Sequence, residues 1–107
     1  MILKDNFFGM LGFAVRSGNV ALGAVACDKG VKSGKVALIL LDDGASERTK
    51  KDTRNMCKFY EVPMIIAEPA GMMSQRCGRA GLMIVGVTDG RFAKRLLEIA
   101  ESENAEV

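Results

Sequence analysis

Two apolar runs, Val36-Ala-Leu-Ile-Leu-Leu41 and Leu82-Met-Ile-Val-Gly-Val87, show what kind of sheet this chain can form. Both have the length of a strand, and neither alternates with polar residues as a strand with one face in water would. Such strands are hidden only in a sheet that helices cover on both faces. We therefore predict that residues 36–41 and 82–87 are neighbouring interior strands.

The segments around these runs have helical and strand patterns in turn. Apolar residues three or four positions apart, with Gly or polar residues at the ends, predict helices over residues 4–17, 24–33, 46–60, 70–78 and 89–100. Shorter strands are predicted at residues 20–22 and 62–66, and Pro63 places the second at a strand start or a sheet edge. Alternating helices and strands indicate an α/β fold, a sheet between two helical layers.

Single positions within these helices set further expectations. Ser46 is expected to accept hydrogen bonds from the first N–H groups of the third helix. Gly30 lies inside the second predicted helix, where Gly lowers helix stability by about 1 kcal/mol relative to Ala. Its presence makes the prediction of this helix weaker. The apolar side chains expected in the core are Phe7, Phe8, Leu11, Met56, Phe59, Tyr60, Met64, Met83, Phe92, Leu96, Ile99 and Ala100.

Composition limits the chain to one domain that spans residues 1–107. With 107 residues, 49% of them hydrophobic, it can bury one compact core. All fifteen Lys and Arg residues precede residue 100, whereas three of the thirteen acidic residues lie after it, which leaves a net charge of +5 on residues 1–100. A basic body of this kind suits an anionic partner such as nucleic acid. The acidic segment 101–107 is expected to fray.

Several functional classes are disfavoured by what the sequence contains. Three widely spaced cysteines and no histidine give neither a disulfide framework nor a zinc site, so the cysteines are expected to be buried thiols. Without histidine the usual activation of a thiol or hydroxyl nucleophile is missing, so no enzyme, cofactor or metal is expected. Asp42 and Asp43 alone form no coordination shell. No apolar run is long enough for a membrane span, and we expect a cytoplasmic monomer with no membrane partner.

A series of short motifs, none specific alone, runs through the chain in order. It comprises Met10-Leu-Gly-Phe-Ala14, Ala21-Leu-Gly23, Lys29, Ser33-Gly-Lys35, Leu38-Ile-Leu-Leu41, Asp43, Ala45-Ser46, Tyr60-x-Val-Pro63, Val87-Thr-Asp89 and Phe92-Ala-Lys94. Over about residues 7–98 this series resembles the bacterial YlxQ-like branch of the superfamily that contains the archaeal ribosomal proteins L-seven-Ae and L-thirty-e.

The resemblance implies a fold and a function together. It implies a three-layer α/β/α sandwich with a mixed sheet of about four strands, as in ribosomal L-thirty-e, and a small RNA-binding module without catalytic chemistry. Members of the best-known branch grip the sharply bent kink-turn of RNA with a Gly-x-Asn-Glu-x-x-Lys motif at the start of the second helix. An apolar loop before the last strand helps them. Asn and Glu read the edges of sheared G·A pairs, while the lysine neutralises phosphate.

Carried over position by position, the motif is only partly present in this chain. Gly23 and Lys29 match the glycine and the lysine, whereas the Asn and Glu positions fall on Val25 and Ala26. The resemblance therefore implies binding of structured RNA, ribosomal or kink-turn-like, mainly through phosphate and shape contacts. The predicted RNA-binding residues are Gly23, Ala24, Val25, Ala26, Lys29, Lys32 and Lys50, with Arg79, Ala80, Gly81 and Leu82 from the apolar loop.

Two interpretations of these residues remain open. Lys29, Lys32 and Lys35 form a lysine cluster that can follow phosphates, although each alone can be an ordinary solvated lysine. The basic residues of segment 50–58 fit a solvated helix face better. The second interpretation is a family member that has lost base readout and serves as a protein-interaction module, with Val25 and Ala26 in an apolar contact patch.

Overall fold

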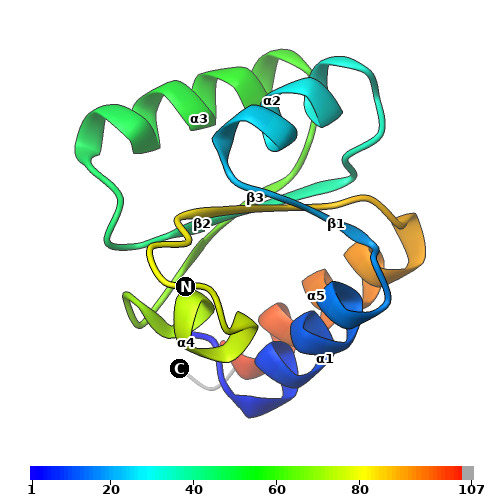
Figure 1. Ribbon diagram of the computed structural model, residues 1–107, viewed down its shortest axis with the longest axis vertical. Helices are drawn as coiled ribbons and strands as arrows, with labels where there is room; N and C mark the ends of the chain where they lie inside the picture. Colours follow the sequence, from blue (N-terminus) through cyan, green and yellow to red (C-terminus); the bar gives the residue numbers. More distant parts are fainter. Residues whose placement is uncertain (105–107) are drawn as a thin grey trace.

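A four-stranded sheet lies between two layers of helices in the computed structural model, which describes residues 1–104 (Figure 1). Helices α2 and α3 cover one face, and α1, α4 and α5 cover the other. In chain order the elements are α1 (Asp5–Arg16), β1 (Val20–Leu22), α2 (Ala24–Lys32), β2 (Leu38–Asp42), α3 (Glu47–Phe59), β3 (Met64–Ala67), α4 (Met72–Cys77), β4 (Ile84–Val87) and α5 (Gly90–Glu103). The predicted three-layer α/β/α fold is confirmed.

The sheet is mixed, with the strand order β1-β4-β2-β3. Strand β4 is antiparallel to both of its neighbours, pairing Val85 with Leu40 of β2 and with Leu22 of β1. Strand β3 lies parallel to β2 at the edge, as Pro63 suggested. The two apolar runs are neighbouring interior strands, and every residue of β2 and β4 is buried.

Each face of the sheet has its own hydrophobic core. Leu38 and Leu40 belong to the larger core, under α1, α4 and α5, whereas Ile39 and Leu41 belong to the smaller core, under α2 and α3. Successive side chains of a strand point to opposite faces, so a strand with both faces covered needs apolar residues at every position. This is the physical reason for the unbroken run in the sequence.

Helix α2 lies close to the sheet because of two glycines, Gly30 in the helix itself and Gly86 in β4. A Cβ at Gly30 would overlap the Val36 side chain, and a Cβ at Gly86 would lie 3.0 Å from the same residue. Gly30 therefore has a packing role that outweighs its low helix propensity.

The predicted apolar stripe of α3 was wrong. Thr53 and Cys57 are its buried residues, whereas Phe59 is 79% exposed and Tyr60 is 39% exposed. The helix therefore turns two small side chains toward the sheet and leaves its aromatic end outside. Met56, Met64, Phe92 and Cys77 are only half-buried, and Met83 is exposed, so these expectations of core positions also need correction.

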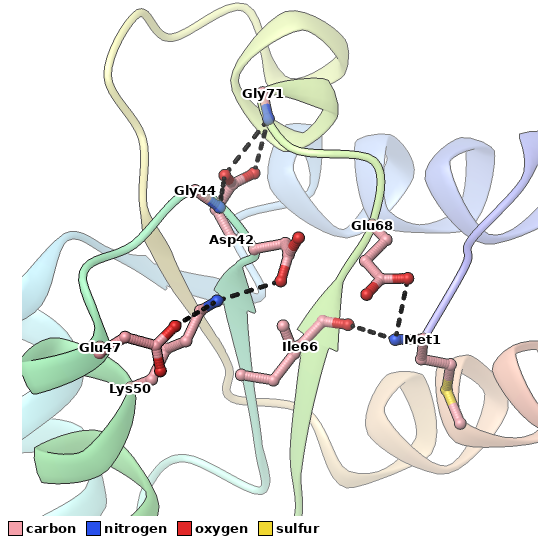
Figure 2. A network of polar contacts seen from close by, with 9 residues as sticks. Met1, Asp42, Gly44, Glu47, Lys50, Ile66, Glu68 and Gly71 are labelled. Carbon is pink, nitrogen blue, oxygen red and sulfur yellow. Dashed lines mark hydrogen bonds and ion pairs between the residues drawn. The ribbon is translucent and has the colours of Figure 1, made fainter.

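The ends of the chain are held together rather than frayed up to residue 104. Figure 2 shows the Met1 amino group, which donates to the Ile66 carbonyl at 3.1 Å and pairs with Glu68 at 3.6 Å. Helix α5 continues to Glu103, and the Asn104 side-chain carbonyl accepts the N–H of Ile2 at 3.2 Å. The expectation of a frayed tail from residue 101 was wrong for residues 101–104, and residues 105–107 lie outside the described part. Among the described helices none is long and apolar enough to cross a membrane.

Candidate nucleic-acid interface

One end of the sheet brings together three of the segments that the sequence predicted to contact RNA. The N–H of Gly23, at the start of α2, donates to the Ile84 carbonyl at 3.1 Å. The N–H of Asp42, at the end of β2, donates to the Met83 carbonyl at 2.7 Å. The loop before β4 thus lies between the start of α2 and the turn that leads into α3. Residues from distant parts of the sequence meet here because β1 and β2 end where β4 begins.

The start of α2 is exposed and has only small or apolar side chains. Gly23 precedes the helix with φ 88° and ψ 166°, a conformation that favours glycine. Ala24, Val25 and Ala26 are exposed, Val25 to 71%, and the first turn contains no acidic residue. Their backbone N–H groups have no carbonyl partner within the helix, and they lie at its positive end.

Three of the other four helices have a side-chain oxygen that accepts an N–H group of their first turn. Ser46 accepts from Thr49 in α3, and Asp89 accepts from Arg91 and Phe92 in α5, which holds the pKa of the Asp89 carboxyl below its usual range. The Glu103 carboxylate accepts N–H groups at the start of α1, and Asp42 accepts that of Gly71 before α4 (Figure 2). Within residues 1–104, α2 and the six-residue α4 have no side chain that accepts an N–H of their first turn.

The predicted lysines differ in how free their charges are. Lys29 is exposed and has no ion-pair partner among the described residues. Lys32 pairs with Asp28 at 3.0 Å, and this contact raises the pKa of Lys32 above its ordinary value. Lys35 follows the last turn of α2 and lies beyond that helix's C-terminal end, so the expected lysine cluster is spread along the helix.

Lys50 is held by the protein itself. Its ammonium lies 3.1 Å from Asp43 and 3.7 Å from Glu47, and its side chain is only 15% exposed (Figure 2). The hydrogen bond to Asp43 raises the pKa of Lys50, and Glu47 adds to the effect. The carboxylate of Asp42 is fully buried and bonds the N–H groups of Gly44 and Gly71, at 2.8 and 2.9 Å. The Asp42-Asp43 pair therefore fixes this end of the sheet.

Only part of the predicted loop is accessible. Arg79, Ala80 and Gly81 are exposed, and Gly81 has a φ of 72°. Leu82 is 6% exposed and packs in the larger core, so its side chain is turned away from the candidate interface. Met83, which was expected in the core, is 38% exposed at this end instead. No sequence signal distinguishes Met83 from the rest of the apolar run, and it is exposed because β4 begins only at Ile84.

Comparison with known proteins identifies the family. No protein-family model matches the chain. The RNA-binding protein YlxQ of Bacillus subtilis is 30% identical over 95 residues, which cover 89% of this chain and 95% of that protein. The chain belongs to the YlxQ family. A second YlxQ RNA-binding protein, from Enterococcus faecium, is 27% identical over 98 residues, or 92% of this chain and 94% of the other.

More distant relatives place the YlxQ family in the predicted superfamily. The large ribosomal subunit protein eL30 of Sulfolobus acidocaldarius is 28% identical over 101 residues, covering 92% of this chain and 97% of that one. A solved structure of a Bacillus halodurans C protein of unknown function has a TM-score of 0.85 at 25% identity, over 92% and 99% of the two chains. The 15.5kD RNA binding protein of Giardia lamblia shares the fold, with a TM-score of 0.74 at 14% identity over 99% and 94%. None of the named relatives carries the name of an enzyme, in keeping with the expectation of a non-catalytic protein.

Proposed function

We propose that this YlxQ-family member is a cytoplasmic, monomeric protein that binds structured RNA without catalysing a reaction. The RNA lies at the end of the sheet where α2 begins. The observation that carries the proposal is the exposed start of α2, whose first-turn N–H groups have no side-chain acceptor. Free N–H groups at the positive end of a helix suit a phosphate oxygen. The RNA-binding and ribosomal names of the relatives support the same ligand.

The binding is expected to depend mainly on phosphates and on RNA shape. Val25 and Ala26 stand where the family motif has Asn and Glu, and neither side chain can hydrogen-bond to a base edge. Gly23 and Gly81 allow the backbone to approach the RNA closely. Lys29 is the lysine of this surface whose charge is not already paired within residues 1–104. Counterion release should then supply most of the affinity.

A titration at two salt concentrations tests this function. A kink-turn RNA and an unbent control duplex of equal length are titrated against the protein at about 50 and 200 mM salt. We expect affinity to fall steeply with salt for both RNAs. Lys29→Ala should lower the salt slope by about one unit, with the free energy of unfolding changed by less than about 0.5 kcal/mol.

The matched control is Lys94→Ala, because Lys94 is an exposed lysine on the opposite layer, in α5. It should leave the slope unchanged. Salt-insensitive binding, or equal slopes for Lys29→Ala and the wild type, would contradict the proposed surface.

One observation favours a second candidate function. Val25 exposes 71% of its surface beside a helix start, which suits an apolar contact with another protein. In that case the chain would be a protein-interaction module derived from an RNA-binding ancestor. Crosslinking in cells, followed by recovery of bound RNA, separates the two functions. Only an RNA-binding protein should yield crosslinked RNA, and the Lys29→Ala variant should yield less of it.

A further inference from the structure

Helices α2 and α3 lie side by side over one face of the sheet (Figure 1), and the side chains of the two helices line a groove. The groove has a volume of about 690 Å³. The groove is lined by Val25 and Lys32 from α2 and by Met56 and Phe59 from α3. Tyr60 lines it just after α3, and Ile84 of β4 lies at its floor. Most of this lining is apolar, and the groove begins at the same exposed helix start that forms the candidate RNA interface.

The aromatic end of α3 is exposed in this groove. Phe59 is 79% exposed and Tyr60 is 39% exposed, and their rings meet edge to face with centroids 4.9 Å apart. Exposed at this level, Phe59 adds little to the hydrophobic core. An exposed aromatic pair beside an apolar floor offers ring faces and edges to a flat ligand.

The charges around the groove favour an anionic ligand. Its two lining carboxylates are neutralised within their own helices, Asp28 by Lys32 at 3.0 Å and Asp52 by Arg48 at 3.9 Å. The exposed residues Lys51, Arg54 and Lys58 form a stripe on the outer side of α3. None of them lines the groove, but the stripe adjoins its rim at Asn55, which is four residues from Lys51 and three from Lys58. In the described chain none of the three residues of this stripe forms an ion pair, and neither does Lys29 on the outer side of α2.

We propose that this groove binds a short single-stranded segment of RNA, with bases against Phe59 and Tyr60 and phosphates along the cationic residues beside them. The inference rests on the proposed function, because the groove continues from the start of α2. Every nucleotide offers both a flat base and a phosphate, which matches an apolar floor flanked by cations. The RNA that suits this protein therefore carries unpaired nucleotides next to its structured part.

Tyr60 gives this proposal a direct optical readout. It is the only tyrosine of a chain without tryptophan, so intrinsic fluorescence reports on the groove alone. The full chain is titrated with a structured RNA in three forms: blunt, with a single-stranded adenosine extension, and with an abasic extension of the same length. We expect the adenosine extension to quench Tyr60 and to tighten binding about fivefold or more, as stacking on aromatic side chains does. The blunt and abasic forms should leave the fluorescence unchanged.

Phe59→Ala tests the residue that the proposal depends on. Because Phe59 is mostly exposed, the variant should keep its unfolding midpoint, and Phe59→Leu is a second variant that retains apolar bulk without an aromatic ring. Both should lose the gain from the adenosine extension while binding blunt RNA as the wild type does. Phe13→Ala is the matched control, since Phe13 is 54% exposed on α1 in the opposite layer. It should retain the gain.

The outcomes separate this inference from the proposed function. If blunt RNA binds but the adenosine extension neither quenches Tyr60 nor depends on Phe59, the groove is not an RNA site, although the helix start remains one. A different result would overturn the inference by making the groove a protein interface. In that result Phe59→Ala loses self-association or binding to an acidic peptide, while the gain in affinity from the adenosine extension is unchanged. Failure of all three RNA forms to bind would overturn both.

Discussion

Val25 and Ala26 are the two residues that most limit what this protein can recognise. Both are exposed in the first turn of α2, and neither contributes to the core. Their side chains can therefore be changed without loss of packing in the core. The lack of hydrogen-bonding groups at these two positions affects which RNA the protein can recognise, and not whether it folds.

Replacing both residues tests this directly. In the double variant Val25→Asn with Ala26→Glu, we expect the ratio of kink-turn to duplex affinity to rise about tenfold, because each well-placed base contact contributes about 1–3 kcal/mol of discrimination. The acidic residue at the positive helix end should also stabilise the fold by about 0.3–1 kcal/mol. Competition binding with the two RNAs measures the ratio.

The control has the same composition in reversed order, Val25→Glu with Ala26→Asn. It should gain the helix stabilisation without the kink-turn preference. If both variants prefer the kink-turn equally, the motif has been placed on the wrong residues.

At the scale of single elements, periodicity located the helices well but oriented α3 wrongly. A stripe of Met56, Phe59 and Tyr60 is more hydrophobic than one of Thr53 and Cys57, so a reading of the sequence prefers it. The structure turns the smaller pair inward. Which stripe of α3 faces the sheet depends on the space above it, and that space is set by residues elsewhere in the chain.

Helix α2 provides the clearest test of packing at this scale. Gly30→Ala should destabilise the protein by about 1–3 kcal/mol, because the added Cβ would overlap Val36 and force the helix away from the sheet. Gly9→Ala is the control, since Gly9 lies inside α1 with open space around it and should gain up to about 1 kcal/mol. Urea unfolding of both variants gives the comparison. A neutral or stabilising Gly30→Ala would show that α2 can move outward freely.

At the scale of the whole molecule, the layered fold was predictable from sequence because two uninterrupted apolar strands leave few alternatives. The candidate site was only partly predictable. The structure brings the segments near Gly23 and Gly81 to one end of the sheet, but the pairing of Lys50 with Asp43 and the burial of Leu82 depend on tertiary contacts. The tail was mispredicted for the same reason, since Glu103 bonds the N–H of Lys4, 99 positions away.

Glu103 should matter to stability although it lies at the end of the described chain. Its carboxylate accepts the N–H groups of Lys4 at 2.8 Å and Phe7 at 3.4 Å, at the start of α1. Glu103→Ala should lower the free energy of unfolding by about 0.5–2 kcal/mol, the usual range for loss of a helix cap. Glu101→Ala removes an exposed carboxylate from the same helix and should be close to neutral. Equal thermal unfolding midpoints for the two variants would show that the contact does not stabilise α1.

The hydrogen bonds between Ile2 and Asn104 have a practical consequence for the connectivity of the chain. Residues 2 and 104 are close enough to be joined by a short linker, which is the condition for circular permutation. The order of the helices along the chain would then change while their arrangement in space stays the same. New ends could be opened at the exposed Ser33-Gly34 turn, which lies between α2 and α3 in the chain. The two helices would then no longer be consecutive in sequence, but both would still lie over the same face of the sheet.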